Sequence, residues 1–270
     1  MTTLAAPLSS TPYGAPTAFL NVVRSEFSKL FTVRSTYWML LAAVVFNVGL
    51  AAGLAAFVPD ALSAEDQAAV DPTRLSLGGI HLSQIVFGMV GVFIITTEYG
   101  TGTIRSTLAA IPRRRSVLTA KALVSSAATL AFGIASSFAA FAVFQALLTG
   151  DGMRTSLSDT GVLRAVIGGG LYVTVLGLLG LGLGAILRSS AGASAALFGL
   201  LFAPPLLVGL LPPAWQADIR PYVPMEAGSQ IFIAVAEPGA LSPWQGFGIF
   251  TVYAVLALIG GFILIRRRDA

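Results

Sequence analysis

Residues 117–148 read VLTAKALVSSAATLAFGIASSFAAFAVFQALL, a run of 32 residues in which Lys121 is the one charged residue. As an α-helix this run would be about 48 Å long at ~1.5 Å per residue, whereas the hydrocarbon core of a bilayer is roughly 30 Å thick. Backbone polar groups cannot stay unpaired in hydrocarbon, so the run is expected to be helical. It therefore predicts a transmembrane helix that tilts or projects beyond the membrane at its N-terminal, cytoplasmic end.

Five more apolar stretches of spanning length flank this run. The chain is 56% hydrophobic and 10% charged, with a mean hydropathy of +0.84, which is too apolar for a surface that faces water. We expect an all-α integral membrane protein with a single six-span transmembrane domain at residues 17–270. Its six transmembrane helices are predicted at residues 37–58, 75–97, 117–148, 165–187, 191–211 and 247–265, the fifth interrupted by Pro204 and Pro205.

The charged residues between these stretches alternate in sign from one connection to the next. One side of the predicted membrane carries twelve basic and three acidic residues, and the other side carries four basic and nine acidic residues. Basic residues near the ends of spans remain in the cytoplasm, so both termini are predicted to be cytoplasmic. The basic side comprises Arg24, Lys29, Arg34, Arg105, Arg113, Arg114, Arg115, Lys121, Arg188, Arg266, Arg267 and Arg268.

The N-terminal segment divides into two parts. Residues 1–16 are rich in Ala, Pro, Ser and Thr and lack the basic and apolar segments of a signal peptide, so a disordered tail is expected. In residues 17–33 apolar and polar residues alternate at helical spacing, which predicts an amphipathic helix in the cytoplasmic interface. A plain cytoplasmic extension of the first span is the alternative. The expected apolar face consists of Phe19, Leu20, Val23, Phe27, Leu30 and Phe31, with Asn21, Arg24, Ser25, Ser28 and Lys29 opposite.

Several function classes are disfavoured by composition. The sequence pI is about 9.8, but its basic residues lie at membrane boundaries, where topology and anionic lipid explain them better than nucleic acid does. Without cysteine there is no disulfide, thiolate metal site or cysteine nucleophile. The two lysines lack the glycines of a phosphate-binding loop, and the glycines at residues 168–184 indicate close helix packing instead.

An intramembrane serine hydrolase is the remaining enzymatic reading. Ser194 lies in a GASA segment, and His81 is the one histidine of the chain. Ser194 is expected near the cytoplasmic face and His81 near the external face, so the two cannot share a proton. We expect no catalytic residue, metal site or cofactor in this chain. The predicted spans also lack a charged residue at mid-depth, which disfavours a pump or antiporter that works alone and points to energy from another subunit.

Residues 98–116 form the most distinctive connection. Glu98 follows a span on the cytoplasmic side, where a carboxylate opposes the helix dipole and needs a compensating partner. Gly100 can end the span, and Thr101 or Thr103 can cap a short helix through Leu108 that Pro112 terminates. An ordinary basic loop is the alternative. The longest external segment, residues 212–245, holds six prolines, and its apolar patch at residues 231–236 suggests a re-entrant or interfacial helix.

With these features the chain resembles the permease subunits of type-2 ABC transporters, the drug and polysaccharide exporter class. The resemblance covers nearly the whole chain and includes EYGTGTIRSTLAAIPRRRSVLTAK at residues 98–121. It implies that this segment holds a coupling helix that contacts a separately encoded ATP-binding subunit, which carries ATP and Mg. The implied coupling residues are Glu98, Gly100, Thr101, Gly102, Thr103, Arg105, Pro112, Arg113, Arg114, Arg115 and Lys121.

The resemblance further implies a pair of permease chains, expected to be a homodimer, in the bacterial plasma membrane. The expected function is ATP-driven export of an amphipathic small molecule, drug or lipid, with hydrolysis on the partner subunit. The alternatives are a membrane scaffold or sensor without transport and, more remotely, an intramembrane hydrolase.

Overall fold

The computed structural model describes residues 15–32, 34–111, 114–148, 152–236 and 239–267. Six long helices dominate these ranges, and each is long and apolar enough to cross a membrane, which confirms the predicted six-helix membrane fold. They are α2 (Arg34–Ala61), α5 (Ile80–Gly100), α7 (Arg114–Leu147), α8 (Val162–Leu187), α9 (Ser190–Val208) and α12 (Pro243–Arg267).

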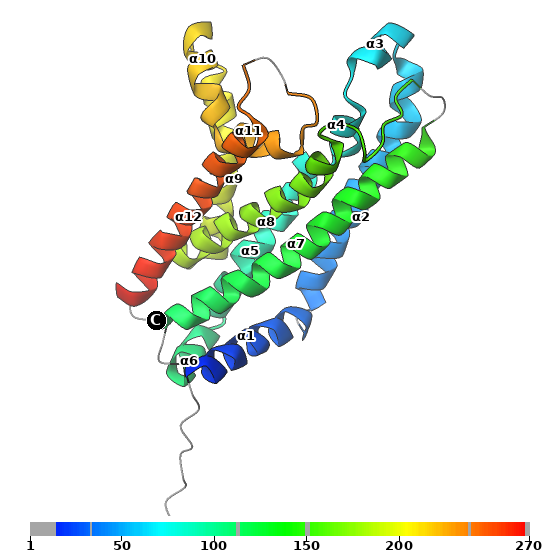
Figure 1. The fold of residues 1–270 in the computed structure, drawn as a ribbon. Coiled ribbons are helices and arrows are strands. Elements are labelled where there is room, and N and C mark those ends of the chain that lie inside the picture. The colour runs from blue at the N-terminus through cyan, green and yellow to red at the C-terminus, as the bar shows by residue number, and fades with distance from the viewer. Residues whose placement is uncertain (1–14, 33, 112–113, 149–151, 237–238, 268–270) are drawn as a thin grey trace, which may run out of the picture.

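Short helices cover the two ends of this bundle (Figure 1). We call the end that carries α1 and α6, where α12 also finishes, the α6 end; the opposite end, with α3, α4 and α10, is the α10 end. The short elements are α1 (Ala15–Thr32), α3 (Ala64–Ala69), α4 (Pro72–Ser76), α6 (Thr103–Ala110), α10 (Pro213–Ile219), α11 (Pro224–Ser229) and the 3-10 turns η1 (Arg220–Tyr222) and η2 (Gln230–Phe232).

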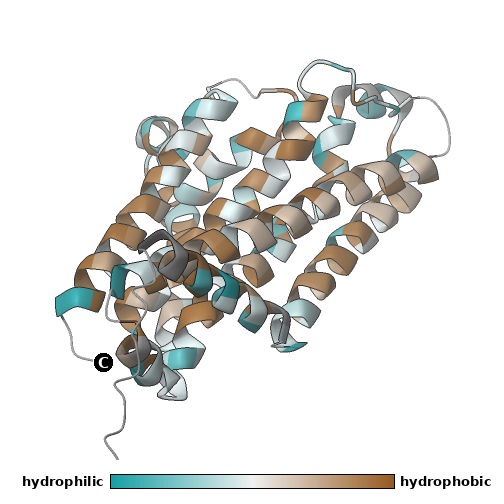
Figure 2. Cartoon of the chain, turned by 60° about the horizontal axis from the view of Figure 1, so that its bottom comes forward, coloured by the Kyte–Doolittle hydropathy of each residue, from teal (hydrophilic) through white to brown (hydrophobic). Residues whose placement is uncertain are grey.

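The outer surface of the long helices is apolar. Figure 2 shows hydrophobic residues along their middle portions and hydrophilic residues gathered toward the ends. Large side chains are exposed there, including Phe57 at 76% and Leu206 at 72%. An apolar belt of this kind is expected for helices that face lipid.

Helix α8 lies at the centre of the bundle, packed against α5, α7 and α12. Its glycines allow this, because a Cβ on Gly180 would collide with the carbonyl oxygen of Gly88 on α5. Similarly, a Cβ on Gly182 would lie 2.7 Å from the carbonyl carbon of Ala257 on α12. The expected role of this glycine-rich stretch in helix packing is confirmed.

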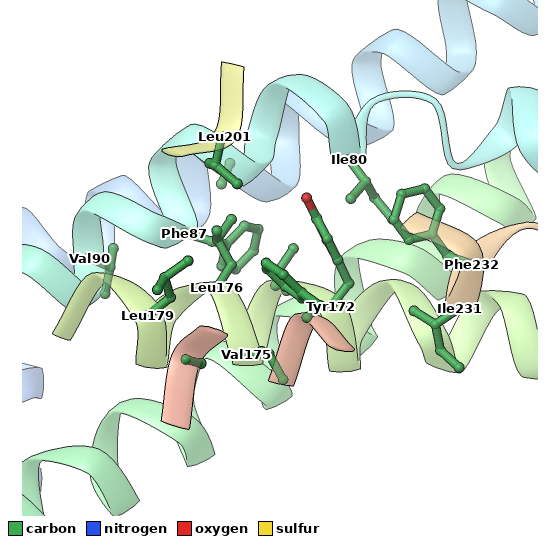
Figure 3. Close-up of a cluster of buried hydrophobic side chains, with 14 of the residues drawn as sticks. Ile80, Phe87, Val90, Tyr172, Val175, Leu176, Leu179, Leu201, Ile231 and Phe232 are labelled. Atoms are coloured by element: carbon green, nitrogen blue, oxygen red, sulfur yellow. The ribbon is translucent and has the colours of Figure 1, made fainter. Parts of the chain in front are cut away.

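Tyr172 occupies the core between α8 and its neighbours. Its hydroxyl points toward α5 (Figure 3) and donates a hydrogen bond to Oε1 of Gln84. The ring stacks on Phe250 with centroids 5.0 Å apart and meets the edge of Phe232 at 5.2 Å. The buried polar group is therefore satisfied while the ring joins α5, α8, α12 and η2.

The apolar patch at residues 231–236 differs from the expectation. It forms no interfacial helix of its own: Ile231 and Phe232 end the 3-10 turn η2, buried against α8, and residues 233–236 are not helical. Arg164 on α8 holds this segment in place, because its guanidinium donates to the carbonyls of Ile231 at 2.9 Å, Ile233 at 2.9 Å and Ala234 at 3.3 Å. These donations satisfy carbonyls that have no helical partner.

Several boundaries also differ. The second span begins at Ile80 and not at residue 75, because Asp71 caps the separate helix α4 by accepting from the backbone N–H of Thr73 at 2.9 Å. Helix α7 has 34 residues, about 51 Å at ~1.5 Å per residue, so it is longer than the predicted run. The tail expected at residues 1–16 lies outside the described residues except for Ala15 and Pro16, which begin α1.

Candidate functional site

The distinctive segment at residues 98–111 forms a tight turn and a short helix. Helix α5 ends at Gly100, and α6 begins at Thr103 and continues to Ala110, two residues beyond the predicted end. Between them Gly102 has φ = 73°, a left-handed conformation that glycine adopts without strain. This turn sets the direction in which α6 leaves the bundle.

The predicted threonine cap of α6 is wrong. The N-cap position is Gly102, which has no side chain to accept a hydrogen bond, and Thr103 is already the first helical residue. The Thr101 hydroxyl instead donates to the carbonyl of Thr97 at 2.8 Å and lies 2.9 Å from the Thr103 hydroxyl. Pro112 and Arg113, expected to terminate the helix and to contact a partner, lie outside the described residues.

Four charged side chains meet beside this turn, and we call them the four-charge cluster: Glu26 and Lys29 of α1, Glu98 of α5 and Lys121 of α7. Nζ of Lys121 lies 2.7 Å from Oε1 of Glu98 and 2.8 Å from Oε2 of Glu26. Nζ of Lys29 lies 2.9 Å from Oε1 of Glu98 and 2.7 Å from Oε1 of Glu26. Each lysine thus bonds both carboxylates, and the cluster joins three helices in a closed ring.

The cluster is largely removed from solvent. Lys121 is 1% exposed, Glu26 5% and Glu98 9%, whereas the Lys29 side chain is 41% exposed. Isolated charges at such depth would be strongly unfavourable, but two positive and two negative groups balance here. Lys121 gains a further acceptor, the carbonyl of Ile94 at 3.3 Å.

The carboxylates also fix the charge state of Lys29. Burial by itself lowers the pKa of its ammonium, but hydrogen bonds and charge attraction from Glu26 and Glu98 outweigh it and raise the pKa above its ordinary value. Lys29 therefore stays protonated at neutral pH, as the ring requires.

Sequence reasoning found part of this cluster. It predicted that Glu98 needs a compensating partner, and the structure supplies Lys121 and Lys29. It placed Lys29 on the polar outer face of α1 and overlooked Glu26, which in fact lies on a buried face with Val22 and Leu30. Val22, Glu26 and Leu30 are spaced four residues apart, and residues at this spacing share one face of a helix. This spacing could have indicated that Glu26 is buried.

Helix α1 has two apolar faces instead of the single one expected. Val22 and Leu30 are buried against the bundle, while Leu20 at 68% and Phe27 at 51% are exposed on the other side. Phe19 and Val23 are half-buried. The expected apolar face is therefore divided, one part packing on the protein and the other available to a membrane surface.

The remaining predicted basic residues occupy two kinds of position. Arg105 on α6 and Arg115 on α7 are exposed. Arg114 donates to the carbonyl of Ile265 at 3.3 Å, near the end of α12, where carbonyls lack helical partners.

Arg188 ties the junction of α8 and α9 to the same region. It has φ = 54° and places its guanidinium 5.0 Å from the ring centroid of Tyr99. It also donates to the carbonyl of Leu264 at 3.4 Å.

A cavity of about 650 Å³ lies next to the four-charge cluster at the α6 end. Helices α1, α2, α5, α6 and α7 contribute its walls, which include Glu26, Lys29, Glu98 and Lys121. The site thus combines a short projecting helix, a buried ionic ring and an adjoining cavity.

The hydrolase reading gains no geometric support. Ser194 lies near the start of α9 at the α6 end, and His81 lies near the start of α5 at the α10 end. His81 is half-buried, with its ring edge-on to Phe232 at 5.3 Å. Among the described residues, no three His, Cys, Asp or Glu side chains group as metal ligands would.

Comparison with known proteins identifies the family. A family model described as ABC-2 family transporter protein matches residues 22–202, which is 181 of 270 residues. The match includes α6 and all four residues of the cluster. A search of curated proteins found no match. Since the model covers more than half of the chain, this multi-pass membrane protein belongs to the ABC-2 transporter family and is a permease component.

Proposed function

We propose that this chain is the membrane subunit of an ATP-driven exporter and that α6 receives the movement of a separate ATP-binding subunit. Three observations support the proposal: the family match, the position of α6 at the end of the bundle, and the four-charge cluster beside it. The α6 end then faces the cytoplasm, as the excess of basic residues there favours. ATP and Mg bind on the partner, and a second permease chain in the bacterial plasma membrane completes the transporter.

The four-charge cluster is the observation that carries this proposal. Glu98 lies three residues before Thr101, where the turn at Thr101 and Gly102 begins, so a displacement of α6 acts on Glu98 first. Its Oε1 atom is bonded to lysines of α1 and α7, which must follow or release it. A buried ionic network of this kind has few alternative arrangements, and it suits the transmission of a discrete change.

Helix α7 extends the effect across the molecule. Lys121 lies near the α6 end of this helix of 34 residues, which reaches the α10 end as one continuous element. A shift imposed through the cluster would therefore be felt at both ends of the bundle. The cargo that we propose is an amphipathic small molecule, drug or lipid.

The first test is Glu98→Ala in the transporter assembled with its ATPase. The variant should insert into the membrane and assemble, yet lose transport and the stimulation of ATP hydrolysis by substrate. Glu65→Ala is the matched control, since Glu65 is an exposed carboxylate of α3 at the α10 end. If Glu98→Ala transports as well as the parent protein, Glu98 has no role in coupling.

The second test concerns the docking of α6. Arg105→Glu reverses an exposed charge on α6 and should weaken copurification with the ATPase. Arg220→Glu reverses an exposed charge at the α10 end, at a side chain that is 65% exposed, and should leave copurification unchanged. Assembly with an ATPase that hydrolyses ATP without any transported molecule would favour the scaffold or sensor reading.

A further inference from the structure

The cavity at the α6 end has the size of a small-molecule site. Its volume of about 650 Å³ falls within the range of roughly 300–1,000 Å³ that such sites occupy. Met39 of α2, Val90 and Phe93 of α5 and Val124 of α7 form an apolar part of its wall. A molecule with an apolar body would therefore bury that body here.

The polar part of the wall offers acceptors. Seven hydroxyl groups line it, and the four on Thr97, Thr101, Ser106 and Thr107 already donate their hydrogens to helix carbonyls. A hydroxyl whose hydrogen is used in this way presents only lone pairs to a ligand. These bonds run from Thr97 to the carbonyl of Phe93 at 2.6 Å, from Thr101 to Thr97 at 2.8 Å, and from Ser106 and Thr107 to Thr103 at 2.8 and 3.1 Å.

Glu98 adds a fifth acceptor. Its Oε1 atom receives both lysines, but the buried Oε2 atom accepts no hydrogen bond from any residue in the described part of the chain. A buried acceptor without a donor is unfavourable, and a carboxylate oxygen can only accept. A donor from a bound molecule would remove this deficit once the carboxylate turns this atom, which has almost no accessible surface, toward the cavity.

The charge of the wall selects against ions. Glu26 and Glu98 together cancel Lys29 and Lys121, and all four line the cavity. A ligand with a net charge would enter a largely buried place without a counter-charge. An uncharged donor does not meet this penalty.

We propose that this cavity, formed by one chain, binds an uncharged amphipathic molecule whose polar end carries hydroxyl or amide hydrogen-bond donors. Only its identification as cargo rests on the proposed function; the binding itself does not. Its apolar body lies between α2, α5 and α7, and its polar end meets the hydroxyl oxygens of α5 and α6 and the carboxylate of Glu98.

The test uses the absence of native cysteine. Ser35→Cys places a thiol in the cavity wall, and Ser28→Cys places one on the exposed side of α1, outside the cavity. The chain alone, in phosphatidylcholine nanodiscs, is labelled with a water-soluble maleimide in the presence of four probes of equal chain length. The probes are dodecanamide, methyl dodecanoate, dodecylammonium and dodecanoate.

Dodecanamide should slow the labelling of Ser35→Cys about five-fold more than methyl dodecanoate does, the difference that one net hydrogen bond gives. The two charged probes should protect no better than the ester, and the labelling of Ser28→Cys should not change. Adding Ser106→Trp, which fills the cavity from α6, should abolish the protection by dodecanamide.

Equal protection by all four probes, stronger protection by a charged probe, or protection that survives Ser106→Trp would each overturn the proposal. Because no ATPase is present, the outcome is independent of coupling. If the chain shows selective protection but does not couple to an ATPase, the proposed function is refuted and the binding site is still supported.

Discussion

Lys121→Met tests whether the four-charge cluster is as buried and interdependent as its geometry indicates. Methionine keeps an unbranched apolar stem but removes the ammonium that bonds Glu98 at 2.7 Å, Glu26 at 2.8 Å and the Ile94 carbonyl at 3.3 Å. Two carboxylates that are 5% and 9% exposed then share Lys29 alone, with one negative charge uncompensated. Breaking a buried pair in this way destabilises a protein by roughly 3–5 kcal/mol.

The measurement is the free energy of unfolding in mixed micelles, followed by circular dichroism as the denaturing detergent increases. The matched control is Lys121→Met combined with Glu98→Gln, which removes one charge of each sign and leaves Lys29 facing Glu26. This double variant should be more stable than Lys121→Met by about 1 kcal/mol or more, since contacting residues are not additive.

The reasoning would be refuted by either of two results. A loss below about 1 kcal/mol for Lys121→Met is the size expected of a solvated surface pair, not of a buried ring. Strict additivity of the two substitutions would show that Glu98 and Lys121 do not depend on each other. In both cases the cluster could not serve as the link between α5 and α7.

Three further predictions concern topology, α1 and pH. Cysteines at Ser63 or Ala240 should react with an impermeant reagent added outside the cell, and one at Ser116 should not; the reverse pattern would invert the topology. Phe27→Glu should release α1 from the membrane surface whereas Ser28→Glu should have little effect, as vesicle flotation of the helix as a peptide can measure; equal effects would contradict an interfacial helix. Since the pKa of Lys29 is raised in the folded state, its contribution to stability is complete below the ordinary value of 10.5 and is lost as pH rises through the raised value. Thermal melting should therefore show a loss above pH 10.5 in the parent that is smaller in Lys29→Met; identical profiles would argue against the pairing.

The transmembrane architecture was predictable because hydrocarbon imposes one local rule, that each long apolar run must be a helix. Runs such as residues 165–187 and 247–265 obey it without reference to the rest of the fold. The need of Glu98 for a partner was likewise predictable, because it follows from the helix dipole at its own position.

The identity of the partners was not predictable, since it depends on contacts between residues far apart in the chain. Glu26 reaches Lys121 across 95 positions, and Arg164 reaches Ile231 across 67. Neither contact leaves a periodic pattern in the sequence. The cap of α6 was missed for a more local reason: a left-handed glycine competes with threonine at a helix start, and only the backbone path decides between them.

The glycine contacts between α5 and α8 bear on which parts of the permease can move. Where the backbone of Gly91 abuts that of Gly177, and that of Gly180 abuts Gly88, there is no side chain to rearrange. Interfaces this close resist sliding, because any shift brings main-chain atoms into collision. Helices α5 and α8 consequently form one rigid block. Because α6 is attached to α5, a movement of α6 is passed to this block.

Motion relative to this block is left to the less embedded helices. In the most apolar stretch of α2 and of α9, only 22% of the residues are buried within the protein, against 67% in that of α8. If α6 receives the movement of an ATPase as we propose, it would tilt α5 and α8 as a unit while α2 and α9 yield around them. Opening and closing in this permease would then be a rotation of the rigid pair α5 and α8 relative to the less buried helices α2 and α9.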